Sequence, residues 1–220
     1  MKIDKNEVLR YLGYKNQHIS DDLNEKINYL IENAYEIISA KTVWEVFEPE
    51  FNDSVALKGT AMQFSGSDIK NHLLGAKKVA VLALTLGINV EREILRYQQT
   101  DMVSAVICDA IFDAATESVA DEAEAEIAAF AKKEGLFTNY RYSPGYGDFP
   151  LDVQGGIISV LNCEKRIGLT VTPCNILLPR KSVTAVIGLF DKEQEKIIHN
   201  CQNCNMKDNC KSKRECKKID

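Results

Sequence analysis

The segment from residue 141 to 151, RYSPGYGDFPL, holds two of the five prolines and two of the twelve glycines of the chain. Proline stiffens the backbone and glycine reaches positive φ, so together they let main-chain N–H and C=O groups approach a ligand closely. Arg141 adds a planar fork of donors suited to a carboxylate, and Tyr142 or Tyr146 adds a flat face for a ring or a cation. The segment therefore predicts a loop that binds a ligand with an anionic end and a flat or cationic end. The alternative is a tight surface connection with a solvated arginine and tyrosines that only pack.

Two carboxylates interrupt an apolar helix face upstream of this segment. At 100° per residue, Glu117 and Asp121 fall on this face. Its apolar members are Val103, Ile107, Ala110, Ala114, Ala125 and Ala128. A buried carboxylate is normally paired, solvated in a cleft or turned toward a cationic ligand. The pattern favours a cleft that accepts a cation; in the alternative, the face leaves the core after Ala115 and both acids are simply hydrated.

Four cysteines near the carboxyl end have the spacing C-x2-C-x5-C-x5-C: Cys201, Cys204, Cys210 and Cys216. In a reducing compartment such clustering indicates a metal site rather than disulfides. Four thiolates can hold zinc or an iron–sulfur cluster, and the spacing does not choose between them. The alternative is a basic tail with incidental thiols. The other three cysteines, Cys108, Cys163 and Cys174, are expected to be buried packing thiols.

Composition narrows the classes of function. The chain has 220 residues and a net charge of -5, which argues against nucleic acid as its main partner. No apolar run approaches the length of a membrane span, and the first residues lack the apolar stretch of a signal peptide. The sequence therefore predicts a cytoplasmic protein without a membrane partner.

The elements that must position these residues mix helices and strands without a regular repeat. Helices are expected from Asp4 to Gly13, from Ser20 onward, from Ser67 to Gly75, from Val90 to Lys133 with a break near residues 99–100, and over 151–163. Strands are expected over 42–47 and 55–64 as a hairpin and over 77–87 with both faces covered, and two more are expected around 179–181. This order favours an α+β fold. Because apolar periodicity ends near residue 191, we expect a body over 1–190 and a metal-binding tail over 191–220.

In these motifs the chain resembles the activation domain of cobalamin-dependent methionine synthase, which binds S-adenosylmethionine. RYSPGYGDFP resembles the family's arginine followed by a Pro-Gly-Tyr turn, and DAATESVADE, VAVLALTLGINVEREI and LLPRKSVTAVIGLF resemble flanking segments in the same order, over roughly residues 76–190. The resemblance implies a twisted antiparallel sheet flanked by helices. It also implies that Arg141, the backbone around Ser143, Gly145 and Tyr146, and Glu117 hold S-adenosylmethionine, with Ser143 in place of the family's alanine.

The reaction implied by this resemblance is reductive methylation of cob(II)alamin. The cobalt supplies the nucleophile, so no residue of this chain is expected to be catalytic, and the protein would be a methyltransferase-associated component of methionine synthase. The chain lacks the Asp-x-His-x-x-Gly signature of a cobalamin-binding domain. The cobalamin is therefore expected on a separate methionine synthase or other corrinoid protein, with a flavodoxin or ferredoxin-type electron donor.

Two other functions fit the same residues. A non-catalytic protein could sense S-adenosylmethionine and dock a corrinoid protein, in which case it would bind the ligand without methyl transfer. Alternatively, the cysteine tail could be the active part, and the protein would be an iron–sulfur electron carrier to a corrinoid protein.

Overall fold

The computed structural model describes residues 1–15 and 17–194. Its centre is a four-stranded antiparallel sheet with the strand order β1-β5-β9-β6. The bounds of these strands are Lys41–Phe47 (β1), Lys78–Thr85 (β5), Phe137–Thr138 (β6) and Ser182–Phe190 (β9). The expected α+β fold, an antiparallel sheet flanked by helices, is confirmed.

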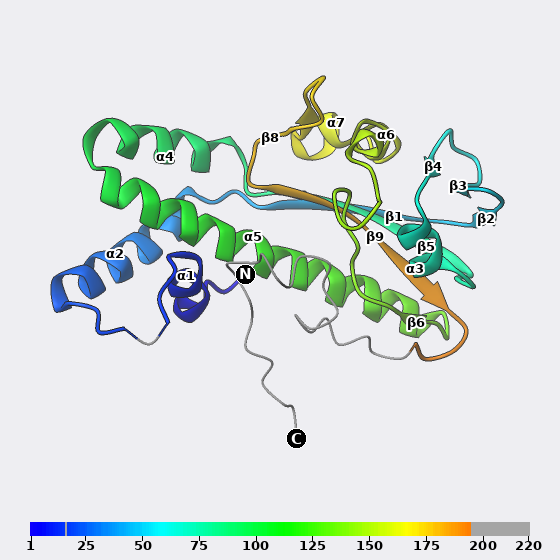
Figure 1. Cartoon of the computed structure of the whole chain (residues 1–220), viewed down its shortest axis with the longest axis horizontal. Coiled ribbons are helices and arrows are strands. Elements are labelled where there is room, and N and C mark those ends of the chain that lie inside the picture. The colour runs from blue at the N-terminus through cyan, green and yellow to red at the C-terminus, as the bar shows by residue number, and fades with distance from the viewer. Residues whose placement is uncertain (16, 195–220) are drawn as a thin grey trace.

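The two central strands are buried on both faces, as the apolar run over 77–87 predicted. Alternate residues point to opposite faces of a sheet. Ala80 and Leu82 pack with Ile127 of the long helix α5 (Met102–Lys133), whereas Val79 and Val81 pack with Ile157 of α6 (Gln154–Val160). Figure 1 shows α5 running along one side of the sheet, with α6 and α7 (Cys163–Ile167) on the other.

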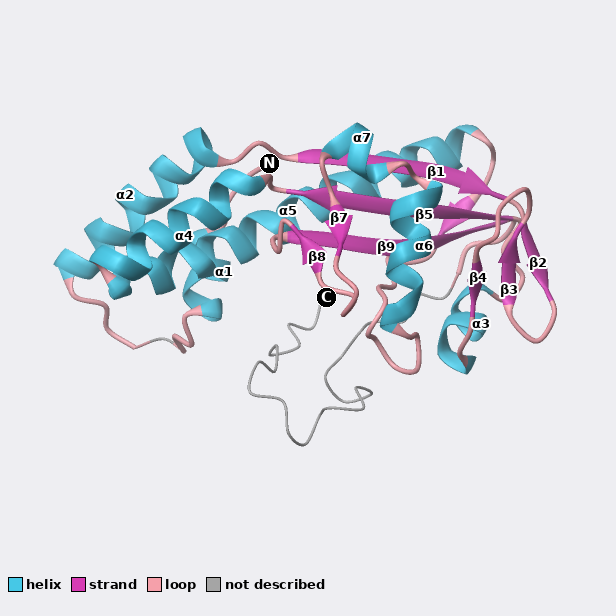
Figure 2. Cartoon of the chain, turned by 90° about the horizontal axis from the view of Figure 1, so that it is seen from above, coloured by secondary structure: helices cyan, strands magenta, loops and turns pink. Residues whose placement is uncertain are grey.

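A group of helices packs on the amino-terminal half of α5 (Figures 1 and 2). Its members are α1 (Lys5–Tyr11), α2 (Asp21–Ile37) and α4 (Ile88–Thr100). Asp4 caps α1 by accepting a hydrogen bond from the Asn6 N–H, as expected. Ser20 occupies the N-cap position of α2, but its side chain makes no capping hydrogen bond. The remaining short helix, α3 (Ser67–Leu73), lies near the opposite end of the sheet.

One expectation about strand pairing was wrong, and two other local elements differ in detail from the prediction. The strand over 42–47 pairs with β5 in the central sheet, and the hairpin at Asn52 joins β2 (Pro49–Phe51) to β3 (Val55–Leu57), with β4 (Gln63–Phe64) beside it. Two strands flank residues 179–181, as expected: β8 (Leu177–Leu178), which pairs with β7 (Thr170–Val171), and β9. The helix expected over 151–163 is divided into a 3₁₀ turn (Leu151–Val153), α6 and α7.

Asp101 separates α4 from α5 and caps the longer helix. Its backbone is extended (φ -156°), its carboxylate accepts hydrogen bonds from the N–H and hydroxyl of Ser104, and Lys26 Nζ donates to it at 2.6 Å. These contacts, that of Lys26 first, lower the pKa of Asp101 below its usual range.

We expect Asp101→Ala to lower the melting temperature by about 2–4 °C, as the loss of a helix cap does in a domain of this size. Because the folded-state pKa is depressed, the contribution is present above the unfolded pKa and is lost as the pH falls through the folded one. The difference from wild type should therefore shrink below about pH 4. Calorimetric melts across pH test this, and Glu32→Ala, which removes an exposed acid from the interior of α2, serves as the control.

Candidate ligand-binding site

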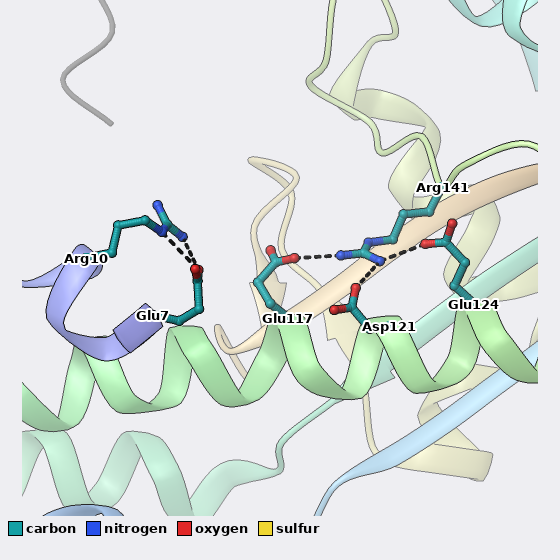
Figure 3. Close-up of polar contacts among 6 residues, drawn as sticks. All are labelled: Glu7, Arg10, Glu117, Asp121, Glu124 and Arg141. Carbon is teal, nitrogen blue, oxygen red and sulfur yellow. Dashed lines mark hydrogen bonds and ion pairs between the residues drawn. The ribbon is translucent and has the colours of Figure 1, made fainter. Parts of the chain in front are cut away.

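Arg141 lies in the loop that carries the chain from β6 back along α5. Gly135 ends α5 in the left-handed conformation (φ 71°), and the chain then pairs briefly with β9. The backbone N–H groups of Tyr142 and Val186 each donate to the other residue's carbonyl at 2.9 Å, which fixes the loop to β9 beside the helix. The side chain of Arg141 therefore extends over α5 (Figure 3).

The guanidinium of Arg141 contacts three carboxylates of α5 (Figure 3). Nη2 donates to Glu117 Oε2 at 2.7 Å, and Nη1 donates to Asp121 Oδ1 at 2.6 Å and to Glu124 Oε2 at 2.7 Å. The three acids share one helix face because their spacing is four and then three residues. We call these four residues the Arg141 cluster. It has more negative than positive charge, so it can accept a further cation.

The four side chains of the Arg141 cluster differ in their exposure to solvent. The side chains of Arg141 and Glu124 are 21% and 27% exposed, whereas those of Glu117 and Asp121 are 41% and 70% exposed. Burial alone would lower the pKa of Arg141, but hydrogen bonds and charges from Asp121, Glu124 and Glu117 outweigh it and raise that pKa. The guanidinium is therefore permanently charged, and a ligand carboxylate would compete with the helix acids for it.

The structure brings together the two side chains that the sequence singled out as ligand contacts, Glu117 and Arg141. Asp121, which shares the helix face with Glu117, is also present. Glu124 was missed, although its position seven residues after Glu117 places it on the same face. The roles of Glu117 and Arg141 as ligand contacts stay predictions.

The loop after Arg141 is held by its own main chain. Gly145 and Gly147 have φ values of 95° and 53°, which favour glycine. The N–H of Gly145 donates to the Phe149 carbonyl at 2.8 Å, and that of Tyr146 donates to the Ser143 carbonyl at 3.2 Å. Since both N–H groups donate within the loop, the backbone here is better suited to accept hydrogen bonds from a ligand than to donate them.

The two tyrosines of the loop differ in exposure. Tyr146 is 58% exposed and offers its ring at the loop surface. Tyr142 is buried and stacks on His72, with ring centroids 4.8 Å apart, and on Phe149. Burial, followed by the charge of Asp68, raises the pKa of Tyr142 to about 12. Tyr142 therefore packs in the core, as the alternative interpretation of the loop proposed, and Tyr146 is the flat face that a ligand can reach.

A second ion-pair group continues along α5 from the Arg141 cluster. Lys181 Nζ lies 2.8 Å from Asp109 and 2.7 Å from Asp113. Burial raises the pKa of Asp113 against the opposing effect of Lys181, and the charges of Asp109 and Glu117 add to the increase. Helix α1 packs against α5 here, and the pKa of Tyr11 is raised by burial and then by the charge of Glu117. The amino-terminal helix thus adjoins the cluster, near the Glu7–Arg10 ion pair drawn in Figure 3.

The cysteines divide into three groups. Cys108 and Cys163 are buried, as expected, and burial raises their pKa values to about 12 and about 11. Cys174 is exposed, so its expected burial was wrong. The proposed metal ligands Cys201, Cys204, Cys210 and Cys216 lie outside the described residues and stay a prediction. Within residues 1–15 and 17–194, no three His, Cys, Asp or Glu side chains are grouped so as to hold a metal ion.

Two further observations concern the described part of the chain. None of its helices combines the length and apolar character needed to cross a membrane.

A hollow of about 380 Å³ lies where Met62 and Gln63 face Asp152 and Gly156. No member of the Arg141 cluster lines this hollow, and its walls carry no group of charges comparable to the cluster. The cluster is therefore the better candidate for the binding of a charged ligand.

Comparison with known proteins agrees with this fold. The crystal structure titled "Crystal Structure of the MetH Reactivation Domain bound to AdoHcy" superimposes with a TM-score of 0.63 at 14% sequence identity, over 84% of this chain and 73% of that chain. At this identity the likeness shows the fold alone. No curated protein sequence matches the chain. The profile of the family described as "Vitamin B12 dependent methionine synthase, activation domain" matches residues 60–214, which is more than half of the chain and includes the Arg141 loop and α5. The chain therefore belongs to the family of vitamin B12 dependent methionine synthase activation domains.

Proposed function

We propose that this protein binds S-adenosylmethionine at the Arg141 cluster and supports the reductive methylation of cob(II)alamin carried by a separate corrinoid protein. The observation that carries the proposal is the contact of one guanidinium with three carboxylates beside a glycine-rich loop. Membership of the activation domain family supports it, and so does the likeness to a structure whose title names bound AdoHcy.

The charges of the ligand match those of the cluster. S-adenosylmethionine has a carboxylate, an ammonium and a sulfonium, so it brings one negative and two positive charges. Its carboxylate would bind Arg141 in place of one or more helix acids, and the acids so released would face its cations. Arg141 and the three acids pair with one another before the ligand binds. Binding would therefore replace these ion pairs with ion pairs to the ligand, and no charge of the cluster would be left unpaired.

The loop would hold the remaining part of the ligand. Carbonyl oxygens near Ser143 and Gly145 can accept hydrogen bonds from the adenine amino group, and the exposed ring of Tyr146 can stack on the adenine. Glu117 and Asp121, the more exposed acids of the cluster, are the groups best placed to face a sulfonium that must remain accessible to a partner.

The chemistry balances with one electron supplied from outside. Cob(II)alamin on the partner takes up one electron, the resulting cob(I)alamin displaces the methyl group from the sulfonium, and methylcobalamin and S-adenosylhomocysteine leave. The breaking S–CH₃ bond leaves its electron pair on sulfur, so no proton is transferred and no general base is needed. The residues of this chain bind the ligand and fix the direction of its methyl group.

The partner would be a cobalamin-binding methionine synthase or another corrinoid protein, reduced by a flavodoxin or ferredoxin-type donor in the cytoplasm. An activation domain must meet the cobalamin that it serves, and the family therefore supports such a contact. The electron donor rests on the chemistry alone, because cob(II)alamin must receive its electron before methyl transfer.

Calorimetric titration of the purified protein with S-adenosylmethionine tests the proposal. We expect saturable binding at a single class of sites. The matched ligand is 5′-methylthioadenosine, which keeps the adenine and a sulfur but lacks the carboxylate, the ammonium and the sulfonium charge. It should bind far more weakly, because it leaves the charged groups of the cluster without new partners. Absence of binding by folded protein, or equal binding of both ligands, would contradict the proposal.

A further inference from the structure

Asp148, at the far end of the loop, binds the start of α3. Its Oδ2 accepts hydrogen bonds from the Ser67 N–H and hydroxyl, each at 2.6 Å, and its Oδ1 accepts one from the Asp68 N–H at 2.9 Å. The first N–H groups of a helix have no partner within the helix, and a carboxylate is their most favourable cap. Here the cap is supplied from 80 residues away.

The contact is reciprocal and closely fitted. The N–H of Asp148 donates to Asp68 Oδ2 at 3.2 Å. Two glycines with positive φ allow the close approach: a Cβ on Gly66 would lie 2.6 Å from Asp148 Oδ1, and one on Gly147 would lie 2.0 Å from Asp68 Oδ2. Both separations are too short for real atoms, so neither position tolerates a side chain while the contact is intact.

The other end of α3 binds the start of the same loop. Asn139 Nδ2 donates to the His72 carbonyl at 2.8 Å, and Asn139 Oδ1 accepts from the Gly188 N–H of β9 at 2.8 Å. Between these ends, the ring of His72 stacks on Tyr142. Helix α3 therefore spans the loop and holds it at both residues 139 and 148.

We propose that Asp148 is a positioning residue whose contact with the start of α3 fixes the conformation of residues 143–149 and thereby the ligand-binding surface. The inference rests on the proposed function for its effect on affinity. The geometry assigns the role to Asp148 because its carboxylate joins the loop to Ser67 and Asp68, while its own N–H completes the pair. The pKa of Asp148 is lowered, first by the Ser67 hydroxyl and then by the backbone N–H groups, so the carboxylate is ionised at neutral pH.

The test compares wild type with Asp148→Ala and Asp148→Asn by two measurements. Amide hydrogen exchange reports the loop directly, and we expect Asp148→Ala to accelerate exchange of residues 143–149 and 67–70 at least about tenfold, with other segments unchanged. Calorimetric titration reports the ligand, and the affinity for S-adenosylmethionine should fall about tenfold. Asp148→Asn keeps one acceptor oxygen and should restore part of the protection from exchange and part of the affinity. This milder variant also allows the test if Asp148→Ala does not fold.

Asp152→Ala is the matched control, because Asp152 is an exposed acid four residues further along the chain. It should change neither measurement. If amide hydrogen exchange of residues 143–149 in Asp148→Ala is the same as in wild type, the inference is overturned, whatever the affinity for S-adenosylmethionine. Faster exchange with unaltered affinity would overturn the link to binding. If wild type does not bind S-adenosylmethionine, the proposed function fails, and the exchange experiment still decides whether Asp148 fixes the loop.

Discussion

Arg141→Ala is expected to weaken the binding of S-adenosylmethionine at least about 100-fold while the protein stays folded. Arg141 is the cation of the cluster, so its loss removes the partner of the ligand carboxylate. It also leaves Glu117, Asp121 and Glu124 without their counter-ion, and they would then repel that carboxylate. The fold should survive because Arg141 is not one of the buried residues of the core and two of the three acids are well exposed to water.

Titration calorimetry measures the affinity for S-adenosylmethionine, and far-ultraviolet circular dichroism shows whether the variant stays folded. Arg141→Lys should keep part of the affinity, because lysine preserves the charge but not the planar fork of donors. Arg96→Ala is the control: it removes an arginine of equal charge from a surface ion pair with Glu93 on α4. Arg141→Ala with wild-type affinity would show that the ligand does not use the cluster.

The sequence predicted the central layers of the fold because their signals are local. The apolar run over 77–87 is short and uninterrupted, as expected for a strand covered on both faces, and β5 has that environment. The break between α4 and α5 was visible at residues 99–100 because helical periodicity fails just before Asp101, the residue that caps the next helix. In both cases neighbouring residues contain the information.

Strand pairing was harder to predict because it joins distant segments. The strand over 42–47 was expected to pair with the next strand along the chain, since hairpins are the commonest local arrangement. Instead it lies beside β5, where Trp44 also packs on Phe130 of α5, with ring centroids 5.4 Å apart. That choice depends on the apolar surface offered by both faces of the central sheet, which no local pattern contains.

In the candidate site, too, local features could be predicted from the sequence and contacts between distant segments could not. Glu117 and Asp121 could be identified because carboxylates on an apolar helix face are visible from periodicity alone. Their contact with Arg141 follows from the reversal of the chain after Gly135, which returns the loop along the helix. The pairing of Asp148 with α3 could not be predicted, because both Asp68 and Asp148 look like ordinary polar loop and helix-start residues until the fold brings them together.

The three acids of the cluster should determine how strongly the site prefers a charged sulfonium to a neutral thioether. S-adenosylmethionine and S-adenosylhomocysteine share their adenine, ammonium and carboxylate, and they differ by one methyl group and one positive charge. The ratio of their affinities therefore reports the electrostatic environment of the sulfur. Opposite charges about 4 Å apart attract by about 1 kcal/mol in water and by more near a protein surface. Neutralising one acid near the sulfur should thus lower the ratio about fivefold.

The experiment titrates both ligands into Glu117→Gln, Asp121→Asn, Glu124→Gln and the triple variant. We expect Glu117→Gln and Asp121→Asn to lower the affinity ratio most, because these acids are the more exposed members and can face a sulfonium that is open to a partner. Glu124→Gln should weaken both ligands alike, because its half-buried carboxylate is better placed for the shared ammonium. The triple variant should lose about 25-fold in the ratio if the effects of Glu117 and Asp121 add. Glu122→Gln, an exposed acid on α5 outside the cluster, should leave the ratio unchanged. A ratio that stays at the wild-type value in all variants would mean that the acids bind only the ammonium, and the preference for a sulfonium would then have to come from the loop.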